Sequence, residues 1–308
     1  MRNTDISESS SDTLRSVFHK PVLTREVMEN LGVVAGKTFI DATLGDAGHT
    51  IEIARRGGRV LGIDRDEDAV KRATNRLVEE ELGIRKRIEL VKGNFSAIKE
   101  LAKKKGFDQI DGILFDLGVS TYQLTTGERG FSVNRDGPLD MRMDQSQDLS
   151  AFDIVNSFSE ESLYAIFTRN AQEHNSRTFA HAIVVARTIN GPIQTTQELA
   201  EIVLKVVRSG RHARIHPATR IFQAIRMEVN QERSELLLAL PKAVDILVPG
   251  GKIAVISFHS GEDRIIKQFF QSSQDIKPLH KHVIQSSEQE MKENNRSRSA
   301  RLRIAEKL

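Results

Sequence analysis

The chain has 308 residues, of which 39% are hydrophobic and 28% are charged, with a formal net charge of only +3. This composition is typical of a globular protein with an ample core, and it restricts any contact with a polyanion to local basic clusters. The absence of cysteine excludes disulfides, thiolate metal sites, cysteine-ligated clusters and every mechanism that requires a cysteine nucleophile.

Residues 1–17 are rich in serine and carry acidic residues, without the apolar core of a signal peptide. We predict a disordered tail there. No apolar run in the chain approaches the roughly 20 residues that a membrane helix needs. We therefore expect a cytoplasmic protein that does not contact a membrane.

Strand and helix patterns alternate through the first part of the chain. Apolar strands are predicted at residues 37–42, 59–63, 87–91 and 109–116, and helices at 51–56, 67–81 and 97–104. Such alternation is typical of the α/β class, with a doubly wound and mostly parallel sheet.

The pattern changes after residue 116. A turn-rich stretch at 125–148 precedes predicted helices at 152–158, 160–168, 176–189, 196–207 and 218–240, and Thr195 with Glu198 forms a capping box for the fourth of these. Strands are then predicted at 252–258, 282–285 and 300–305. We therefore predict a cofactor-binding domain in two pieces, 18–124 and 222–308, with an inserted all-helical substrate-recognition domain at 125–221.

A glycine turn after the first strand is the clearest ligand signal. Gly45 and Gly48 follow the strand that ends at Asp41, and the next strand ends at Asp64, about 20 residues after Gly45, the spacing of a carboxylate that receives ribose hydroxyls. Glycine turns also arise from close packing alone, and Asp64 could instead start the next helix, although Asp66 is the better-placed cap.

The details of this turn favour S-adenosylmethionine over a dinucleotide. Ala47 stands where a dinucleotide fingerprint has its middle glycine, and Asp46 adds an acid that a pyrophosphate would disfavour. Phe95 follows the third strand, where its ring could lie against an adenine or pack in the core. Asp116 and Ser120 follow the fourth strand, at the edge of the sheet where ligands bind in such folds.

Several segments carry a resemblance to a known family, the most specific being Gly137-Pro-Leu-Asp-Met-Arg-Met-Asp144 and Ser257-Phe-His-Ser260. The chain resembles, from residue 19 to the C-terminus, the RsmH (MraW) family of S-adenosylmethionine-dependent methyltransferases that act on cytosine N4 in small-subunit ribosomal RNA. It departs from the family pattern in the turn Asp46-Ala-Gly-His49 and in Ala171-Gln-Glu173 of the insert.

The resemblance implies a Rossmann-like class I methyltransferase fold and a cytosine in the P site of the decoding centre of 16S rRNA as substrate, with the small ribosomal subunit as partner. The implied contacts of the cofactor, S-adenosyl-L-methionine, are Ala47, Gly48, His49, Asp64, Phe95, Asp116 and Gln123.

The chemistry of cytosine N4 defines the candidate catalytic residues. Its lone pair is delocalised into the ring, so an acceptor must take an amino hydrogen as the nitrogen attacks the methyl group. The lack of cysteine agrees with an exocyclic nitrogen rather than a ring carbon as the target. The target base is expected to be flipped or presented unpaired. The candidates are Asp116 and Ser120, from their place after the fourth strand, and Asp140 and His259, from the motifs that carry the resemblance.

Basic residues supply the candidate RNA contacts, unless they form only a solvated face. They are Arg208, Arg211, Arg214, Arg220 and Arg226 in one cluster and Arg298 and Arg301 in another. His212 and His216 are four residues apart, but Pro217 disfavours a continuous helix through both, so we predict no metal site.

Two other functions stay open from the residues alone. One is a non-catalytic ribosome-assembly factor that retains the fold, and the other is an amino-methyltransferase that acts on another nucleic acid. The sequence also leaves open whether the protein is a monomer or a homodimer.

Overall fold

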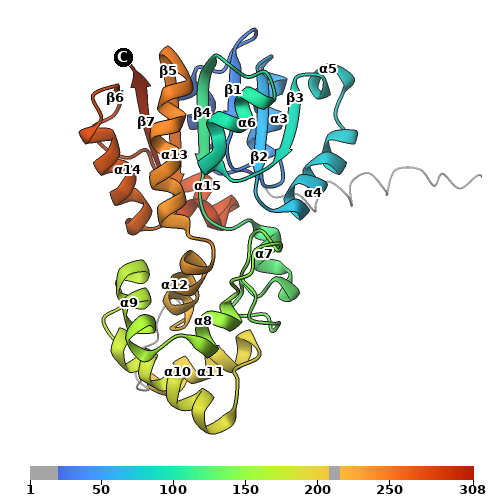
Figure 1. Cartoon of the computed structure of the whole chain (residues 1–308). Helices are drawn as coiled ribbons and strands as arrows, with labels where there is room; N and C mark the ends of the chain where they lie inside the picture. Colours follow the sequence, from blue (N-terminus) through green and yellow to red (C-terminus); the bar gives the residue numbers. More distant parts are fainter. Residues whose placement is uncertain (1–19, 208–215) are drawn as a thin grey trace, which may run out of the picture. The chain divides into compact units, whose positions relative to one another are not determined.

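The computed structural model describes residues 20–207 and 216–308 (Figure 1). These residues form two compact units. The first, which we call the sheet unit, comprises the chain up to Leu117 and from Pro241 onward, and the second, the helical unit, is Gly118–Leu240. The tail predicted at 1–17 lies outside the described residues.

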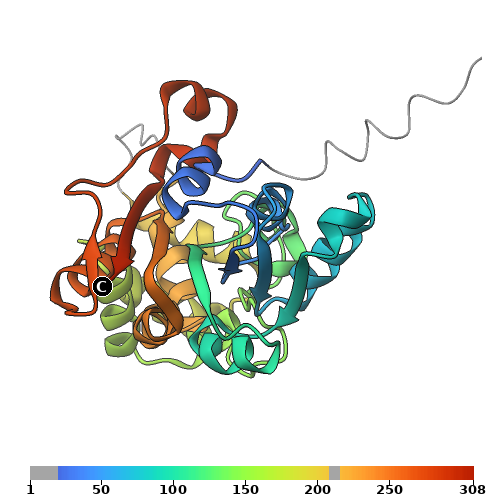
Figure 2. The ribbon, with the colours of Figure 1, turned by 90° about the horizontal axis from the view of Figure 1, so that it is seen from above.

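One seven-stranded sheet forms the sheet unit, in the order β3-β2-β1-β4-β5-β7-β6. The first five strands of this order are parallel, and β7 is antiparallel to both β5 and β6 (Figure 2). This confirms the predicted α/β class with a mostly parallel sheet. The strands are β1 (Thr38–Asp41), β2 (Arg59–Asp64), β3 (Ile88–Lys92), β4 (Ile110–Asp116), β5 (Leu247–Ser257), β6 (Ile276–Pro278) and β7 (Arg301–Lys307).

The central strands are buried on both faces. Adjacent residues of a strand point to opposite faces of the sheet. Both members of such a pair are inaccessible to solvent in β1 (Phe39 and Ile40) and in β4 (Ile113 and Leu114). This explains why these strands appear in the sequence as continuous apolar runs. The helices of the sheet unit are α2 (Thr24–Leu31), α3 (Gly48–Arg55), α4 (Glu67–Val78), α5 (Leu82–Arg85), α6 (Ile98–Lys104), α14 (Ser260–Ser272) and α15 (Glu288–Glu293), with short 3-10 turns η1 (Phe95–Ala97) and η3 (Asn295–Ser299).

The strand predicted at 282–285 is wrong. The outer edge of β7 is instead paired by β6, which aligns Ile276 with Lys307. Residue Ile284 forms only an isolated bridge with Leu302, because β6 already occupies the remainder of that edge.

The helical unit contains the predicted run of helices. Its core is formed by apolar faces that include Ile154, Phe167, Phe179 and Leu199. Thr195 caps α11 by accepting from the Glu198 backbone, as predicted. The elements are α7 (Thr121–Thr125), η2 (Gly127–Arg129), α8 (Ala151–Ser157), α9 (Glu160–Ala171), α10 (Ser176–Asn190), α11 (Thr196–Val206), α12 (Thr219–Val229) and the first part of α13 (Glu232–Ile246).

The boundaries of the helical unit differ from the predicted insertion at 125–221. The unit begins earlier, and Val119 already packs against its core. It ends later because α12 buries Phe222 and Ile225 in the same core. Because its apolar face packs in this core, α12 belongs to the helical unit rather than to the sheet unit.

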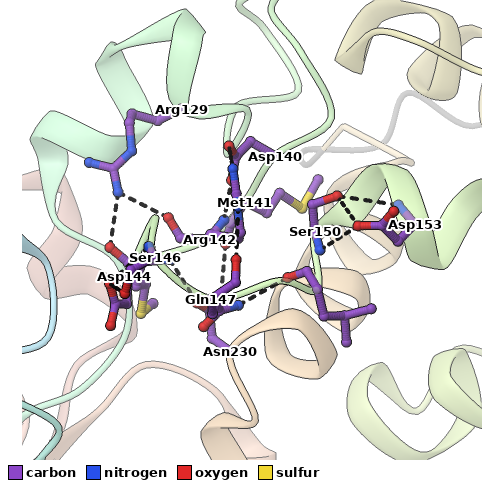
Figure 3. Close-up of polar contacts among 12 residues, drawn as sticks. Arg129, Asp140, Met141, Arg142, Asp144, Ser146, Gln147, Ser150, Asp153 and Asn230 are labelled. Atoms are coloured by element: carbon purple, nitrogen blue, oxygen red, sulfur yellow. Dashed lines mark hydrogen bonds and ion pairs between the residues drawn. The ribbon is translucent and has the colours of Figure 1, made fainter.

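The single long helix predicted at 218–240 is also wrong, because the chain breaks between α12 and α13. Gln231 adopts a left-handed conformation with φ of 49°. The preceding Asn230 is fully buried, and its side chain accepts from the Met143 backbone at 2.8 Å and donates to the Met141 carbonyl at 2.7 Å (Figure 3). The break therefore places Asn230 where its side chain can hold the distant loop that contains Met141 and Met143.

Replacing Asn230 with Ala is expected to lower the free energy of unfolding by about 3 kcal/mol, because buried backbone groups of Met141 and Met143 would lose their partner. Urea denaturation measures this loss. The matched variant Asn190→Ala, at the exposed end of α10, is expected to change stability by less than about 0.5 kcal/mol. Equal stability of the two variants would contradict this role for Asn230.

Candidate functional site

Three carboxylates end neighbouring strands of the sheet unit. Asp64 ends β2, Asp41 ends β1 and Asp116 ends β4. The order β2-β1-β4 aligns these ends along one edge, at the point where the order of the sheet reverses direction. In open α/β sheets this is the place where ligands bind.

Asp41 organises the turn that follows its own strand. Its carboxylate accepts from the Thr50 hydroxyl at 2.8 Å and from the Thr43 backbone at 3.3 Å. Burial raises the pKa of Asp41 to about 6, although these hydrogen bonds oppose the shift. Thr43 in turn accepts from the Asp116 backbone at 2.6 Å, so the exits of β1 and β4 are linked.

The chain makes the tight turn after β1 that its glycines predict. The structure also shows how this turn accommodates Asp46 and Ala47, which depart from the family pattern. Gly45 and Ala47 both have positive φ, of 50° and 60°, and Ala47 is completely buried. The acid of Asp46 is paired with Arg72 of α4 at 2.9 Å, so its charge is compensated within the protein. A side chain at Gly48 would approach the Pro21 ring to 3.0 Å, which leaves room only for glycine without adjustment.

Asp64 fastens this turn to β2. One carboxylate oxygen accepts from the Gly45 backbone at 2.8 Å, and the other accepts from the Asp66 backbone at 2.9 Å. Asp66 itself caps α4 by accepting from the Asp68 backbone, as predicted. Burial raises the pKa of Asp64 to about 6. Each oxygen keeps a second lone pair for a ligand, so the role of Asp64 in binding the cofactor stays a prediction.

Phe95 combines the two roles considered for it. Its ring lies edge-on to Phe115 of β4, with centroids 5.7 Å apart, yet the residue is only half-buried. One part of the ring therefore packs within the sheet unit, and its contact with an adenine stays a prediction.

Asp116 and His49 bring unsatisfied polar atoms to the same edge. Among the residues that the structure describes, Asp116 Oδ1 and both ring nitrogens of His49 are buried without a hydrogen-bond partner. Asp116 Oδ2 and His49 Nε2 are 3.7 Å apart, an electrostatic contact longer than a hydrogen bond. Buried polar atoms without partners are uncommon and mark places that a ligand can satisfy.

Burial has opposite effects on these two groups. It raises the pKa of Asp116 to about 7, with Arg296 opposing the shift, and it lowers the pKa of His49 to about 4, with Arg296 adding to the shift. His49 is therefore neutral at pH 7, and Asp116 is about half protonated. A carboxylate that exchanges its proton near neutral pH is suited to act as a base.

The other candidate catalytic residues form local hydrogen bonds. Ser120 and Gln123 are the two members of a capping box at α7. His259 caps α14, with Nδ1 accepting from the Glu262 backbone at 3.3 Å. The S-x-x-Q signal for the first of these caps was present in the sequence, and our sequence prediction did not use it. Catalytic roles for Ser120 and His259, and a cofactor contact for Gln123, stay predictions.

Asp140 lies in a tightly bonded loop of the helical unit (Figure 3). Both of its carboxylate oxygens accept from the Arg142 guanidinium at 2.9 Å, and Arg142 also donates to the Gln147 carbonyl. The buried Arg129 donates to the Arg142 and Met143 carbonyls. These bonds give Asp140 and Arg142 of the Pro-Leu-Asp-Met-Arg-Met-Asp motif a structural role, and a catalytic role for Asp140 stays a prediction.

The arginines predicted to contact RNA differ in how far their side chains are exposed to solvent. Arg220 is exposed beside Glu173, whereas Arg226 is largely buried in a bidentate pair with Glu232 at 2.7 and 2.8 Å. In the sheet unit Arg298 is exposed and Arg301 is half-buried. Arg208, Arg211 and Arg214 lie outside the described residues.

Clusters of metal ligands and membrane-spanning helices are absent from residues 20–207 and 216–308. Within these ranges no group of three or more His, Asp or Glu side chains could hold a metal ion, and His212 lies outside them. No helix in the described part of the chain is long and apolar enough to cross a membrane.

The fold and this edge define a class of protein. The antiparallel β7 between β5 and β6 distinguishes the sheet from the dinucleotide-binding order 3-2-1-4-5-6. The turn lacks the full dinucleotide fingerprint, and unsatisfied Asp116 and His49 atoms remain for a ligand with amino and hydroxyl groups. The molecule is a class I, S-adenosylmethionine-dependent methyltransferase.

Comparison with known proteins gives the family. The model of the MraW methylase family matches residues 16–308, and the chain belongs to this family. It is 42% identical to the "Ribosomal RNA small subunit methyltransferase H" of Carboxydothermus hydrogenoformans, over 94% of this chain and 98% of that protein. It is 45% identical to the protein of the same name from Deinococcus deserti, over 96% and 95% of the two chains.

Proposed function

We propose that the protein transfers the methyl group of S-adenosylmethionine to the exocyclic N4 of a cytosine in the P site of the decoding centre of 16S rRNA, within the small ribosomal subunit and in the cytoplasm. The observation that carries the choice of an amino group is Asp116, whose free carboxylate oxygen and pKa of about 7 suit a base. The names of the relatives support small-subunit ribosomal RNA as substrate.

The residues of the sheet unit divide the work of the reaction. When bound, the cofactor supplies a methyl group on a positively charged sulfur. Ala47, Gly48 and Asp64 at the glycine turn would hold this cofactor, and Asp116 would accept one amino hydrogen of the cytosine as its nitrogen takes the methyl group. His49, neutral at pH 7, lies 3.7 Å from the other oxygen of Asp116 and brings no charge to it.

The pH dependence follows from the pKa of Asp116. Because burial raises this pKa to about 7, the carboxyl is protonated and inactive as a base below that value and ionised above it. We expect the single-turnover rate to rise through pH about 7 and to level off at higher pH. Measured rates that do not change between pH about 5.5 and 9 would contradict Asp116 as the base.

A non-catalytic assembly factor would be favoured if the altered Asp46-Ala47 turn could not bind the cofactor. In the structure Arg72 compensates the charge of Asp46, and Ala47 adopts the backbone that the turn requires. A left-handed alanine costs only about 1 kcal/mol, so the turn remains suited to a cofactor. This favours the enzyme.

Incorporation of labelled methyl groups tests the proposed substrate. Intact small subunits, naked 16S rRNA and duplex DNA are each incubated with the protein and labelled S-adenosylmethionine, and calorimetry measures cofactor binding separately. We expect incorporation into the RNA of small subunits. Incorporation into DNA would instead favour an enzyme for another nucleic acid, and cofactor binding without any transfer would favour the assembly factor.

A further inference from the structure

Strand β4 continues past the end of its neighbour β1. Asp41, the last residue of β1, is aligned with Leu114, and β4 runs two residues further to Asp116. The Leu114 carbonyl points toward β1, where it accepts from the Ala42 backbone at 2.8 Å. Backbone groups two residues apart in a strand point to the same side, so the Asp116 N–H is also directed toward β1. It therefore needs an acceptor beyond the point where the strand β1 ends.

The side chain of Thr43 supplies this acceptor. Its hydroxyl oxygen accepts from the Asp116 backbone at 2.6 Å. Thr43 is held in turn by Asp41, which accepts from the Thr43 backbone at 3.3 Å with one carboxylate oxygen. The other oxygen of Asp41 accepts from the Thr50 hydroxyl at 2.8 Å. An aspartate that accepts from the backbone two residues further on stabilises a compact turn. A hydroxyl in a fixed turn thus takes the place of a backbone partner for Asp116.

The backbone next to Asp116 is also bonded on its other side. Leu117 donates its backbone N–H to the Ile256 carbonyl of β5 at 3.0 Å. The chain segment that carries the Asp116 carboxylate is therefore held from the side of β1 and from the side of β5. Movement of this carboxylate is then restricted to rotation about its own side-chain bonds.

We propose that Thr43 is a positioning residue for methyl transfer, whose hydroxyl oxygen holds the Asp116 backbone so that the carboxylate stays aligned with the amino group of the target base. This inference rests on the proposed role of Asp116 and adds a second residue to it. A displacement of about 1 Å can slow a reaction by about 100-fold. The position of Thr43 thus requires an oxygen acceptor, and not only a side chain of the right volume.

Thr43→Val tests the proposal, because valine has nearly the same shape as threonine and lacks the acceptor. Exchange of the Asp116 amide hydrogen is followed by NMR in the protein without RNA, and it is expected to become about tenfold faster. Single-turnover methyl transfer to small subunits, at saturating S-adenosylmethionine, is expected to slow by about 10–100-fold. The Kd for the cofactor, measured by calorimetry, is expected to stay within about threefold.

Three further variants separate the hydrogen bond from other effects. Thr43→Ser retains the hydroxyl and is expected to keep both the amide exchange and the transfer rate within about twofold of the unaltered protein. Thr43→Ala removes the acceptor in a smaller side chain and is expected to slow transfer as valine does, which guards against a folding defect caused by valine alone. Thr38→Val makes the same change at the start of β1 and is expected to alter the rate by less than about twofold.

Four outcomes would overturn the proposal. One is a transfer rate in Thr43→Val equal to that of the unaltered protein. Another is a raised Kd for the cofactor with an unchanged rate at saturation, which would make Thr43 a cofactor contact. The third is failure of Thr43→Ser to restore the rate. The fourth is unchanged exchange of the Asp116 amide in Thr43→Val, which is measured without substrate. If the unaltered protein itself transfers no methyl group to small subunits, it is the proposed function that fails.

Discussion

Replacing Asp116 with Asn is expected to slow methyl transfer by about 10²–10⁴-fold, the usual contribution of a positioned base. The amide is nearly the same size as the carboxylate, but it cannot take the amino hydrogen of cytosine. Single-turnover rates on small subunits measure the effect, and calorimetry is expected to show cofactor binding of a similar order in the two proteins.

The same strand offers a matched control for this substitution. Asp111 lies near the other end of β4, where its carboxylate accepts from the Thr38 backbone at 2.9 Å. Asp111→Asn keeps an oxygen for that bond and is expected to change the rate by no more than about twofold. Full activity of Asp116→Asn would remove this carboxylate from the mechanism.

Replacing Asp64 with Asn is expected to raise the Kd for S-adenosylmethionine by about 100-fold, or about 2.7 kcal/mol. An amide cannot accept on both sides, so the backbone of either Gly45 or Asp66 loses its partner, and the contact that we propose with the ribose is weakened as well. Calorimetry with the cofactor measures the change in Kd, and thermal unfolding without ligand shows whether the fold is retained.

The control for Asp64 lies three residues further along. Glu67 begins α4 with an exposed side chain that pairs with Lys71 and Lys92. Glu67→Gln removes the same charge from the same region and is expected to leave the Kd within about twofold. Equal affinities of the Asp64 and Glu67 variants would show that Asp64 only shapes the turn.

The parts of the fold that the sequence predicted are those set by local pattern and burial. Buried parallel strands appear as apolar runs, as at Phe39 and Ile113. Helices tend to begin at a residue whose side chain can accept from the backbone of the first turn. This preference located the caps at Asp66 and Thr195. The division into a sheet and a helical insert followed from the same patterns.

The errors have a common physical cause, which is a contact between residues far apart in the chain. The break at Asn230 exists because its amide holds the backbone of Met141 and Met143, while the amphipathic pattern continues through it. The edge strand β6 was missed because it has only three residues and its partner β7 lies more than 20 residues further along the chain. Neither contact leaves a periodic signal in the sequence.

The candidate site was predicted in part for the same reason. Asp64 and Asp116 could be found because each ends an apolar strand, and parallel strands end at one edge. The 3.7 Å contact of Asp116 with His49 was not predicted, since it depends on how the turn after β1 lies against the end of β4. The structural bonds of Asp140 likewise depend on Arg142 and a folded loop.

Identification of the methylated nucleoside tests the central claim most directly. Small subunits whose decoding-centre cytosines are unmodified are incubated with the protein and S-adenosylmethionine, the 16S rRNA is digested, and mass spectrometry with chromatographic standards identifies the modified base and its fragment. The account predicts N4-methylcytosine in a fragment of the P site. A methyl group on a ring carbon, on a ribose oxygen or in another region of the RNA would contradict it.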